Sequence, residues 1–262
     1  MHRFDQFSGC IIGGAIGDSY GGQFENEAPE IKSEDLFVWG GHKEEREYFL
    51  SDDTQMTLAT CESIIELGKV DTAAISQKYV EWNEKGKLSG LGSATLQAIQ
   101  GIRNGGHWWL VGKKGERAAG NGSAMRIAPI AFALNGIDRS LIQSVSRITH
   151  HNDEAYAGSL AIVFAIQDLI SNNRQAGVDC LIKIGNELPD TLVRDRIIEY
   201  AGLVNETSIQ AIVNQYGNSG YVVESVPLAL FGVAKSWEIG FEASMNEIIQ
   251  SGGDADTNAS MM

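Results

Sequence analysis

Cysteine, positive charge and long apolar runs are all scarce in this sequence. The three cysteines, Cys10, Cys61 and Cys180, are odd in number and far apart, which excludes a disulfide framework and a paired-cysteine zinc motif. No stretch approaches about 18 consecutive apolar residues, so no membrane-spanning helix is expected. The first residues lack the basic and apolar regions of a signal peptide. These absences predict a soluble, cytoplasmic protein that does not bind membranes.

Basic residues number 20 against 34 acidic ones, which gives a net charge of −14. This excess repels a polyanion and argues against nucleic-acid binding, although backbone amides and a metal ion can still hold a small phosphate ligand. Proline is also rare, and no Pro/Ser-rich linker, repeat or low-complexity run divides the chain. We therefore expect a single domain over residues 1–262, acting as a monomer.

Glycine, in contrast, is abundant, at 30 of 262 residues against a usual share of about 7%. Gly9, Gly13 and Gly17 recur at four-residue spacing, which places them on one face of a predicted helix where another helix could come close. Strand signal is weak, even in the irregular segment 26–50. Apolar periodicity predicts an all-α fold, a compact orthogonal helix bundle, with helices at about residues 4–17, 51–68, 71–86, 91–103, 123–134, 138–148, 153–171, 175–187, 190–203, 206–215, 221–236 and 241–250.

Two acidic motifs at opposite ends of the chain predict a metal site. Ser51-Asp52-Asp53-Thr54 offers carboxylates and hydroxyls, and Gly252-Gly253-Asp254-Ala255-Asp256-Thr257-Asn258 offers a second set. Such hard oxygen ligands are those that Mg²⁺ or Mn²⁺ takes. The glycine pair permits positive φ and lets the backbone approach a ligand closely. We interpret the two motifs as one site.

Each motif taken alone has a simpler interpretation. Ser51 can cap a helix whose first turn holds Asp52 and Asp53 in the favourable field of the helix dipole. The run 254–258 opens like an EF-hand loop, but Ala259 stands where that turn needs glycine, and no twelfth-position Glu follows. The EF-hand interpretation therefore fails, and the occurrence of two such motifs favours a metal site over two separate caps.

Two further segments allow both a functional and a structural interpretation. Gly120 to Arg126 carries small residues into a predicted helix, where free amides could bind a diphosphate, or where a flexible loop could simply precede a cap. His150 closes a predicted helix, where it could contact a ligand or act as a cation at the helix end. The local sequence leaves both choices open.

Several motifs together resemble the ADP-ribosylglycohydrolase family, which includes dinitrogenase reductase-activating glycohydrolase and ADP-ribosylarginine hydrolases. The resemblance runs nearly from end to end, and the two Asp motifs are its most specific part. The motifs that carry it are Gly17-Asp18-Ser19-Tyr20-Gly21 with Glu25, Ser51-Asp52-Asp53-Thr54-Gln55-Met56, Gly120-Asn121-Gly122-Ser123-Ala124-Met125-Arg126, Thr149-His150, Glu224-Ser225-Val226-Pro227, and Gly252-Gly253-Asp254-Ala255-Asp256-Thr257.

The resemblance implies an all-α bundle with a cleft that holds two Mg²⁺ or Mn²⁺ ions. Glu25 would assist catalysis beside the metals, with Asp53 and Asp256 as further catalytic residues. The implied metal ligands are Ser51, Asp52, Asp53, Asp254, Asp256 and Thr257. The implied ADP-ribose contacts are Gly120, Asn121, Gly122, Ser123, Met125 and His150. Residues Gly120 to Met125, here called the glycine loop, would hold the diphosphate, and His150 would touch the nucleotide ribose.

Two departures from the family pattern stand out. Ser51 occupies a position where many relatives have Thr, which keeps the hydroxyl. Family members usually continue through a further apolar helix after the second Asp motif, whereas this sequence ends at Met262. Because chain ends fray unless they are tied down, we expect Asp256 and Thr257 to be weakly held.

The implied activity is metal-dependent hydrolysis of the N-glycosidic bond between ADP-ribose and a modified protein side chain, with arginine favoured. Two rival hypotheses remain. The chain could be an ADP-ribose-binding or structural protein of the crystallin type with a degenerate site. It could also hydrolyse another ADP-ribosyl linkage, such as that to serine or to an O-acetyl ester, because no motif records the pocket for the leaving group.

Overall fold

A computed structural model describes residues 3–25, 48–171 and 177–262. Over these residues the fold is all-α, as predicted, with one short parallel pair of strands. The helices are α1 (Arg3–Gly21), α2 (Asp52–Leu67), α3 (Thr72–Glu84), α4 (Ser93–Arg103), α5 (Trp108–Val111), α6 (Ala128–Ala133), α7 (Arg139–Arg147), α8 (Asp153–Ile170), α9 (Val178–Glu187), α10 (Leu192–Ala201), α11 (Ile209–Tyr216), α12 (Val222–Ile239), α13 (Phe241–Gln250) and α14 (Ala255–Met261), with strands β1 (Lys113–Lys114) and β2 (His150–His151) and the 3₁₀ helix η1 (Glu116–Ala118). The segment 26–50 was predicted to be irregular, and its residues 26–47 lie outside the described residues.

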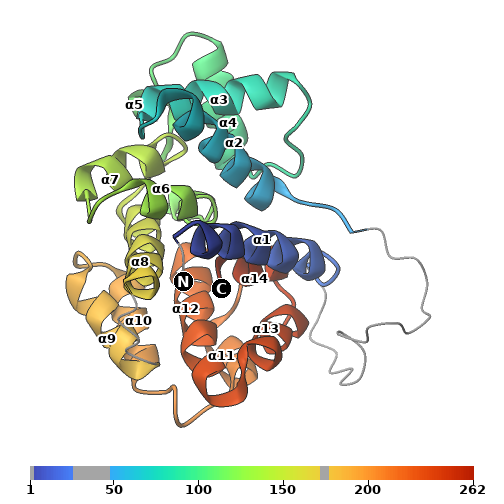
Figure 1. The fold of residues 1–262 in the computed structure, drawn as a ribbon, viewed down its shortest axis with the longest axis vertical. Helices are drawn as coiled ribbons and strands as arrows, with labels where there is room; N and C mark the ends of the chain where they lie inside the picture. The colour runs from blue at the N-terminus through green and yellow to red at the C-terminus, as the bar shows by residue number, and fades with distance from the viewer. Residues whose placement is uncertain (1–2, 26–47, 172–176) are drawn as a thin grey trace.

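Helices α2 to α5 gather at one end of the molecule and α9 to α13 at the other, with α1 and α14 between them (Figure 1). The long helices α8 and α12 pack against each other and are buried along most of their length. Buried apolar side chains such as Leu160, Tyr200 and Phe231 form one continuous core, which supplies the main stabilisation of the fold. No helix among the described residues is long and apolar enough to cross a membrane.

Local signals set several helix ends where the sequence predicted them. The side chain of Asp71 accepts a hydrogen bond from the amide of Ala74 and so caps α3. Gly68 ends α2 with φ of 65°, a left-handed conformation that glycine adopts without steric cost. The helix predicted to begin at residue 123 instead begins at Ala128, with Pro129 in its first turn, where a missing amide hydrogen costs no bond. The preceding residues form turns.

Helix α1 lies alongside α14, and glycines make this close approach feasible (Figure 1). A Cβ atom added to Gly17 or Gly21 would lie 2.4 Å from a backbone oxygen of α14. The predicted glycine face was therefore partly wrong, because Gly9 and Gly13 have no atom within 4 Å of such a Cβ in the described structure. The packed face contains Gly17 and Gly21, and it brings α14 to the end of α1.

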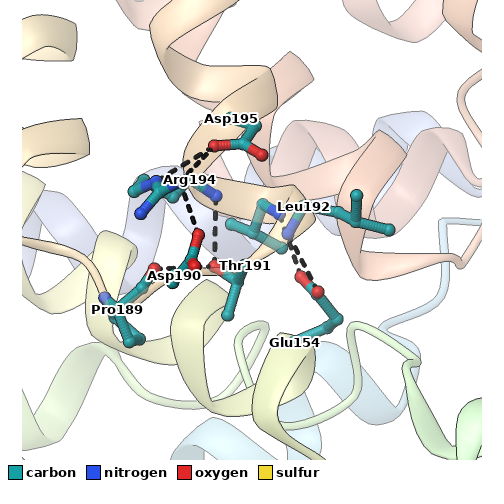
Figure 2. Close-up of polar contacts among 8 residues, drawn as sticks. Glu154, Pro189, Asp190, Thr191, Leu192, Arg194 and Asp195 are labelled. Carbon is teal, nitrogen blue, oxygen red and sulfur yellow. Dashed lines mark hydrogen bonds and ion pairs between the residues drawn. The ribbon is translucent and has the colours of Figure 1, made fainter.

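The beginning of α10 is tied to α8 by a carboxylate. Glu154 accepts hydrogen bonds at 2.9 Å from the amides of Leu192 and Val193, two groups that a helix cannot satisfy internally (Figure 2). Thr191 caps the same helix by accepting from the amide of Arg194. Arg194 also pairs with Asp190 at 2.6 Å and with Asp195 at 2.7 Å (Figure 2). A side chain of one helix thus fixes the start of another.

Candidate active site

The beginnings of α2 and α14 meet in space and bring the two Asp motifs together. The hydroxyl of Thr257 donates a hydrogen bond of 3.0 Å to Oδ2 of Asp53, across 204 residues of sequence. The Ser51 hydroxyl, which caps α2, donates to the same oxygen at 3.2 Å. Asp256 is 6% exposed and Thr257 is 4% exposed. The expectation that these two residues are weakly held was therefore wrong, because packing of α14 against α1 buries them.

Asp18 fixes the position of the first motif, and sequence reasoning did not assign it this role. Its carboxylate accepts hydrogen bonds from the amides of Ser51 and Thr54, at 3.1 and 3.2 Å, and from the Thr54 hydroxyl. We expected the helix to end at Gly17, but α1 continues to Gly21 and so points this buried side chain at α2. The available signal was the motif Gly17-Asp18-Ser19, which shows an acidic residue but not its partner.

Asn218 fixes the second motif and was also missed. Its side-chain amide donates to the backbone carbonyls of Ser251 and Gly252, at 3.0 and 2.7 Å. Its backbone carbonyl accepts from the amide of Asp254 at 3.0 Å. Gly252 and Gly253 have φ of 68° and 69°, which matches the predicted hinge of positive φ. Because the partners of Asn218 are backbone groups more than 30 residues later in the chain, no local pattern could reveal it.

Burial and mutual repulsion act on the carboxylates of both motifs. Burial raises the pKa of Asp52 and of Asp256 to about 7, and neighbouring carboxylates, Asp254 among them, add to each shift. Burial also raises the pKa of Asp53 well above its usual value, and the charge of Asp256 reinforces the shift. Among the described residues, no lysine or arginine forms an ion pair with these side chains. The site therefore favours either protons or added cations.

Glu25, just after α1, completes the acidic cluster. One carboxylate oxygen each from Glu25, Asp254 and Asp256 lie within 4.8 Å of one another, a spacing that suits a shared cation. Asn121 donates a hydrogen bond of 2.6 Å to Oδ2 of Asp254 and so orients that carboxylate. The glycine loop is thereby linked to the acidic cluster.

A cavity of about 370 Å³ opens over this cluster. One part of its wall is acidic, and another carries the cations Lys113 and Arg117, which sequence reasoning did not single out. Of the predicted residues, the wall includes Glu25, Ser51, Asp52, Asp53, Gly120, Asn121, Gly122, Met125, His150, Asp254, Asp256 and Thr257. Such a polarity suits a ligand with hydroxyl groups at one end and negative charge elsewhere.

Ser123 is the one predicted site residue that does not line the cavity. Its buried hydroxyl donates to the carbonyl of Ala155 and accepts from the hydroxyls of Ser146 and Ser159. The side chain therefore stabilises the loop from behind. Because the loop forms turns ahead of Ala128, any phosphate contact would use amides of these turns and not the end of a helix.

Comparison with known proteins identifies relatives of this chain. The sequence profile of the ADP-ribosylglycohydrolase family matches residues 1–262. An ADP-ribosylarginine hydrolase Tri1 from Pseudomonas putida strain GB-1 is 30% identical over 88% of this chain and 62% of its own length, so the chain spans less than two thirds of that relative. A Tri1 protein from Serratia proteamaculans strain 568 is 27% identical over 97% of this chain and 69% of its own.

A solved structure agrees in fold. It is described as an ADP-ribosylglycohydrolase-related protein complex and is 27% identical to this chain, with a TM-score of 0.72 over 99% of this chain and 85% of its own. The match of the family profile to the whole chain and the agreement in fold lead to one conclusion. The chain belongs to the ADP-ribosylglycohydrolase family of glycosidases.

Proposed function

We propose that this protein hydrolyses the N-glycosidic bond between ADP-ribose and a modified protein side chain, with arginine as the favoured linkage and with Mg²⁺ or Mn²⁺ as cofactor. The observation that carries the proposal is the junction of the two Asp motifs through the Thr257–Asp53 hydrogen bond beside the cavity. The names of the two Tri1 relatives support arginine. The protein would act as a single-domain monomer in the cytoplasm.

The residues present fit a pair of divalent cations. Oδ1 of Asp53 is buried and has no hydrogen-bond partner among the described residues, although a buried carboxylate oxygen needs one. The donors around it are carboxylate and hydroxyl oxygens, the ligand type that Mg²⁺ and Mn²⁺ prefer. The ions would be held by Ser51, Asp52, Asp53, Asp254, Asp256 and Thr257. When bound, they would orient ribose hydroxyls and lower the pKa of a bound water.

The protein side chains supply positioning and proton transfer. Glu25 is exposed at the acidic end of the cavity, where its carboxylate can accept a proton from the attacking water. Asp53 and Asp256 are buried and fixed by hydrogen bonds, which suits holding a geometry. Gly120, Gly122 and Met125 form the adjoining wall, where a diphosphate would lie within the field of Lys113 and Arg117.

The central experiment measures ADP-ribose release from defined arginine-linked and serine-linked substrates, with Mg²⁺, with Mn²⁺ and with a chelator. We expect release from the arginine substrate that stops when the metal is removed. Release from the serine substrate alone would shift the proposal to another linkage. Tight ADP-ribose binding with no release from either substrate would favour the binding-protein alternative.

Metal binding can be tested separately by thermal melting. A ligand that binds only the folded state stabilises it by about 2.7 kcal/mol at a hundredfold excess over its Kd. For a chain of this size that gain corresponds to a rise in Tm of roughly 5 to 10 °C. An unchanged Tm from zero to millimolar Mg²⁺ or Mn²⁺ would count against a metal centre at this site.

A further inference from the structure

A buried arginine lies directly behind the glycine loop. Arg126 is 0% exposed, and its two terminal nitrogens donate hydrogen bonds of 2.7 Å to the carbonyl of Gly122 and of 2.8 Å to the hydroxyl of Thr149. The guanidinium also lies 4.9 Å from the ring centre of Tyr79. Among the described residues no carboxylate pairs with it. Burying a cation is costly, and these two hydrogen bonds and the ring contact offset part of that cost.

The direction of the neighbouring hydrogen bond follows from this arginine. A guanidinium can only donate, so the Thr149 oxygen must act as acceptor toward Arg126. The same oxygen lies 2.7 Å from Nδ1 of His150. Thr149 is 0% exposed, and its hydroxyl hydrogen has no other acceptor in the described part of the chain. The hydroxyl therefore donates to Nδ1, and the ring proton of a neutral His150 must sit on Nε2.

The Nε2 side of the ring faces the loop and the cavity. A Cβ added to Gly120 would lie 3.1 Å from Nε2, and one added to Gly122 would lie 2.9 Å from Cε1, so the ring packs directly on the loop backbone. His150 also lines the cavity. The ring stays neutral, because burial and the charges of Arg126 and Lys113 lower its pKa to about 3. The neutral Nε2–H ring therefore offers an N–H donor to the cavity, because its one acceptor nitrogen, Nδ1, is already bonded to Thr149.

We propose that Arg126 and Thr149 are positioning residues that fix His150 as the Nε2–H tautomer, so that it donates a hydrogen bond to an oxygen of the ligand in the cavity. That the ligand is ADP-ribose rests on the proposed function. In this role His150 neither accepts a proton from the substrate nor binds a metal ion. It selects a ligand that presents an acceptor oxygen beside the glycine loop.

The tautomer can be tested in the ligand-free protein by nitrogen-15 NMR, which separates protonated from unprotonated ring nitrogens. The His150→Gln variant assigns the signals. We expect the Nε2–H form in the wild type and in Thr149→Ser, which keeps the hydroxyl, and loss of this single form in Thr149→Val, which keeps the shape without the hydroxyl. A wild-type ring protonated on Nδ1, or a Thr149→Val spectrum equal to that of the wild type, overturns the proposal.

Calorimetry with ADP-ribose tests the donor role. Thr149→Val should weaken binding about tenfold, the effect of one good hydrogen bond to a charged or polar oxygen, while Thr149→Ser should bind nearly as the wild type does. Adding ADP-ribose to the wild type should also shift the Nε2–H signal. Equal affinity of all three proteins, or an unmoved signal on binding, overturns the donor role. Absence of binding to the wild type would instead refute the proposed function and leave the tautomer to the NMR result.

Discussion

Two helices of this protein, α2 and α10, begin at a carboxylate that another helix provides. Asp18 of α1 accepts from the amides of Ser51 and Thr54 at the start of α2. Glu154 of α8 accepts from the first two amides of α10 (Figure 2). Both beginnings also carry further acids nearby. At α10 these acids are Asp190 and Asp195, and Arg194 pairs with both of them. At α2 they are Asp52 and Asp53, which have no such cation among the described residues.

The difference separates a structural arrangement from a functional one. The acids near α10 are exposed, with side chains 90% and 57% accessible, and they are neutralised by the protein itself. The acids of α2 and α14 are largely buried and raise one another's pKa, and among the described residues no basic side chain balances their charge. The start of α10 has its counter-charge within the protein, whereas the start of α2 lacks one among the described residues, as the proposed cation site requires.

The largest expected effect is on turnover. If Asp53 and Asp256 hold the same ions, Asp53→Asn and Asp256→Asn should each lower turnover on the order of a thousandfold, and the double variant should lose little more. Asp190→Asn and Asp195→Asn, at the start of α10, should leave turnover unchanged. Additive losses from Asp53→Asn and Asp256→Asn, or normal turnover per folded molecule, would show that the two motifs do not form one unit.

The next effect is a pH dependence of the metal-free protein. The ordinary pKa of an aspartate is 3.8, and in the folded state Asp52 and Asp256 have a pKa of about 7. A raised folded-state pKa gives stability that is complete below about 4 and is lost as pH rises through about 7. We therefore expect the wild type to lose about 4 kcal/mol over this window relative to Asp256→Asn, which lacks one of the groups.

Urea unfolding in the presence of a chelator, at several pH values, measures this difference. Because both proteins share all other titrating groups, including the buried His150, the comparison isolates the acidic cluster. Bound metal should reverse the trend, since the ligands must lose protons to bind it and metal affinity should rise with pH. Parallel pH profiles for wild type and Asp256→Asn would contradict the electrostatic account of the site.

What the sequence predicted well depends on interactions within a few residues. Ser51, Asp71 and Gly68 cap helices through neighbouring atoms, so their roles follow from local patterns. The helix expected at residue 123 failed because long-range backbone bonds hold that loop: the amide of Asn121 donates to the carbonyl of Gly220, and the amide of Val222 donates to the carbonyl of Ala119. Such bonds leave no trace in local periodicity.

The candidate site divides in the same way. The two Asp motifs could be recognised in the sequence because each groups carboxylate and hydroxyl oxygens, and residues of both motifs line one cavity. The residues that hold them, Asp18 and Asn218, were not visible as such, because each acts on backbone groups of a distant segment. Ser123 looked like part of a phosphate loop and instead joins a buried hydroxyl cluster. Side-chain direction in a turn is set by packing, which a single sequence does not record.

A smaller effect concerns the two carboxylates that begin the helices. Asp18→Asn should lower the free energy of unfolding by about 2 to 3 kcal/mol, because the buried amide group cannot accept all the bonds that the carboxylate accepts. Glu154→Gln, in a more accessible position, should cost about 1 kcal/mol or less. Chemical unfolding of both variants measures the contrast. If Asp18→Asn lost less stability than Glu154→Gln, relief of charge repulsion at Asp18 would be offsetting the loss of its hydrogen bonds.

The smallest effect is expected where the protein supplies its own counter-charge. Arg194→Gln removes the cation that pairs with Asp190 and Asp195, but both acids are accessible to water, and surface ion pairs contribute only about 0.2 to 1 kcal/mol each. We expect a small loss of stability that shrinks as salt screens the charges, with turnover unchanged. Unfolding at low and high ionic strength, together with the release assay, measures both. A loss insensitive to salt would assign the role of Arg194 to packing, and a fall in turnover would contradict the separation between the two helix beginnings, because it would couple the start of α10 to the chemistry at α2 and α14.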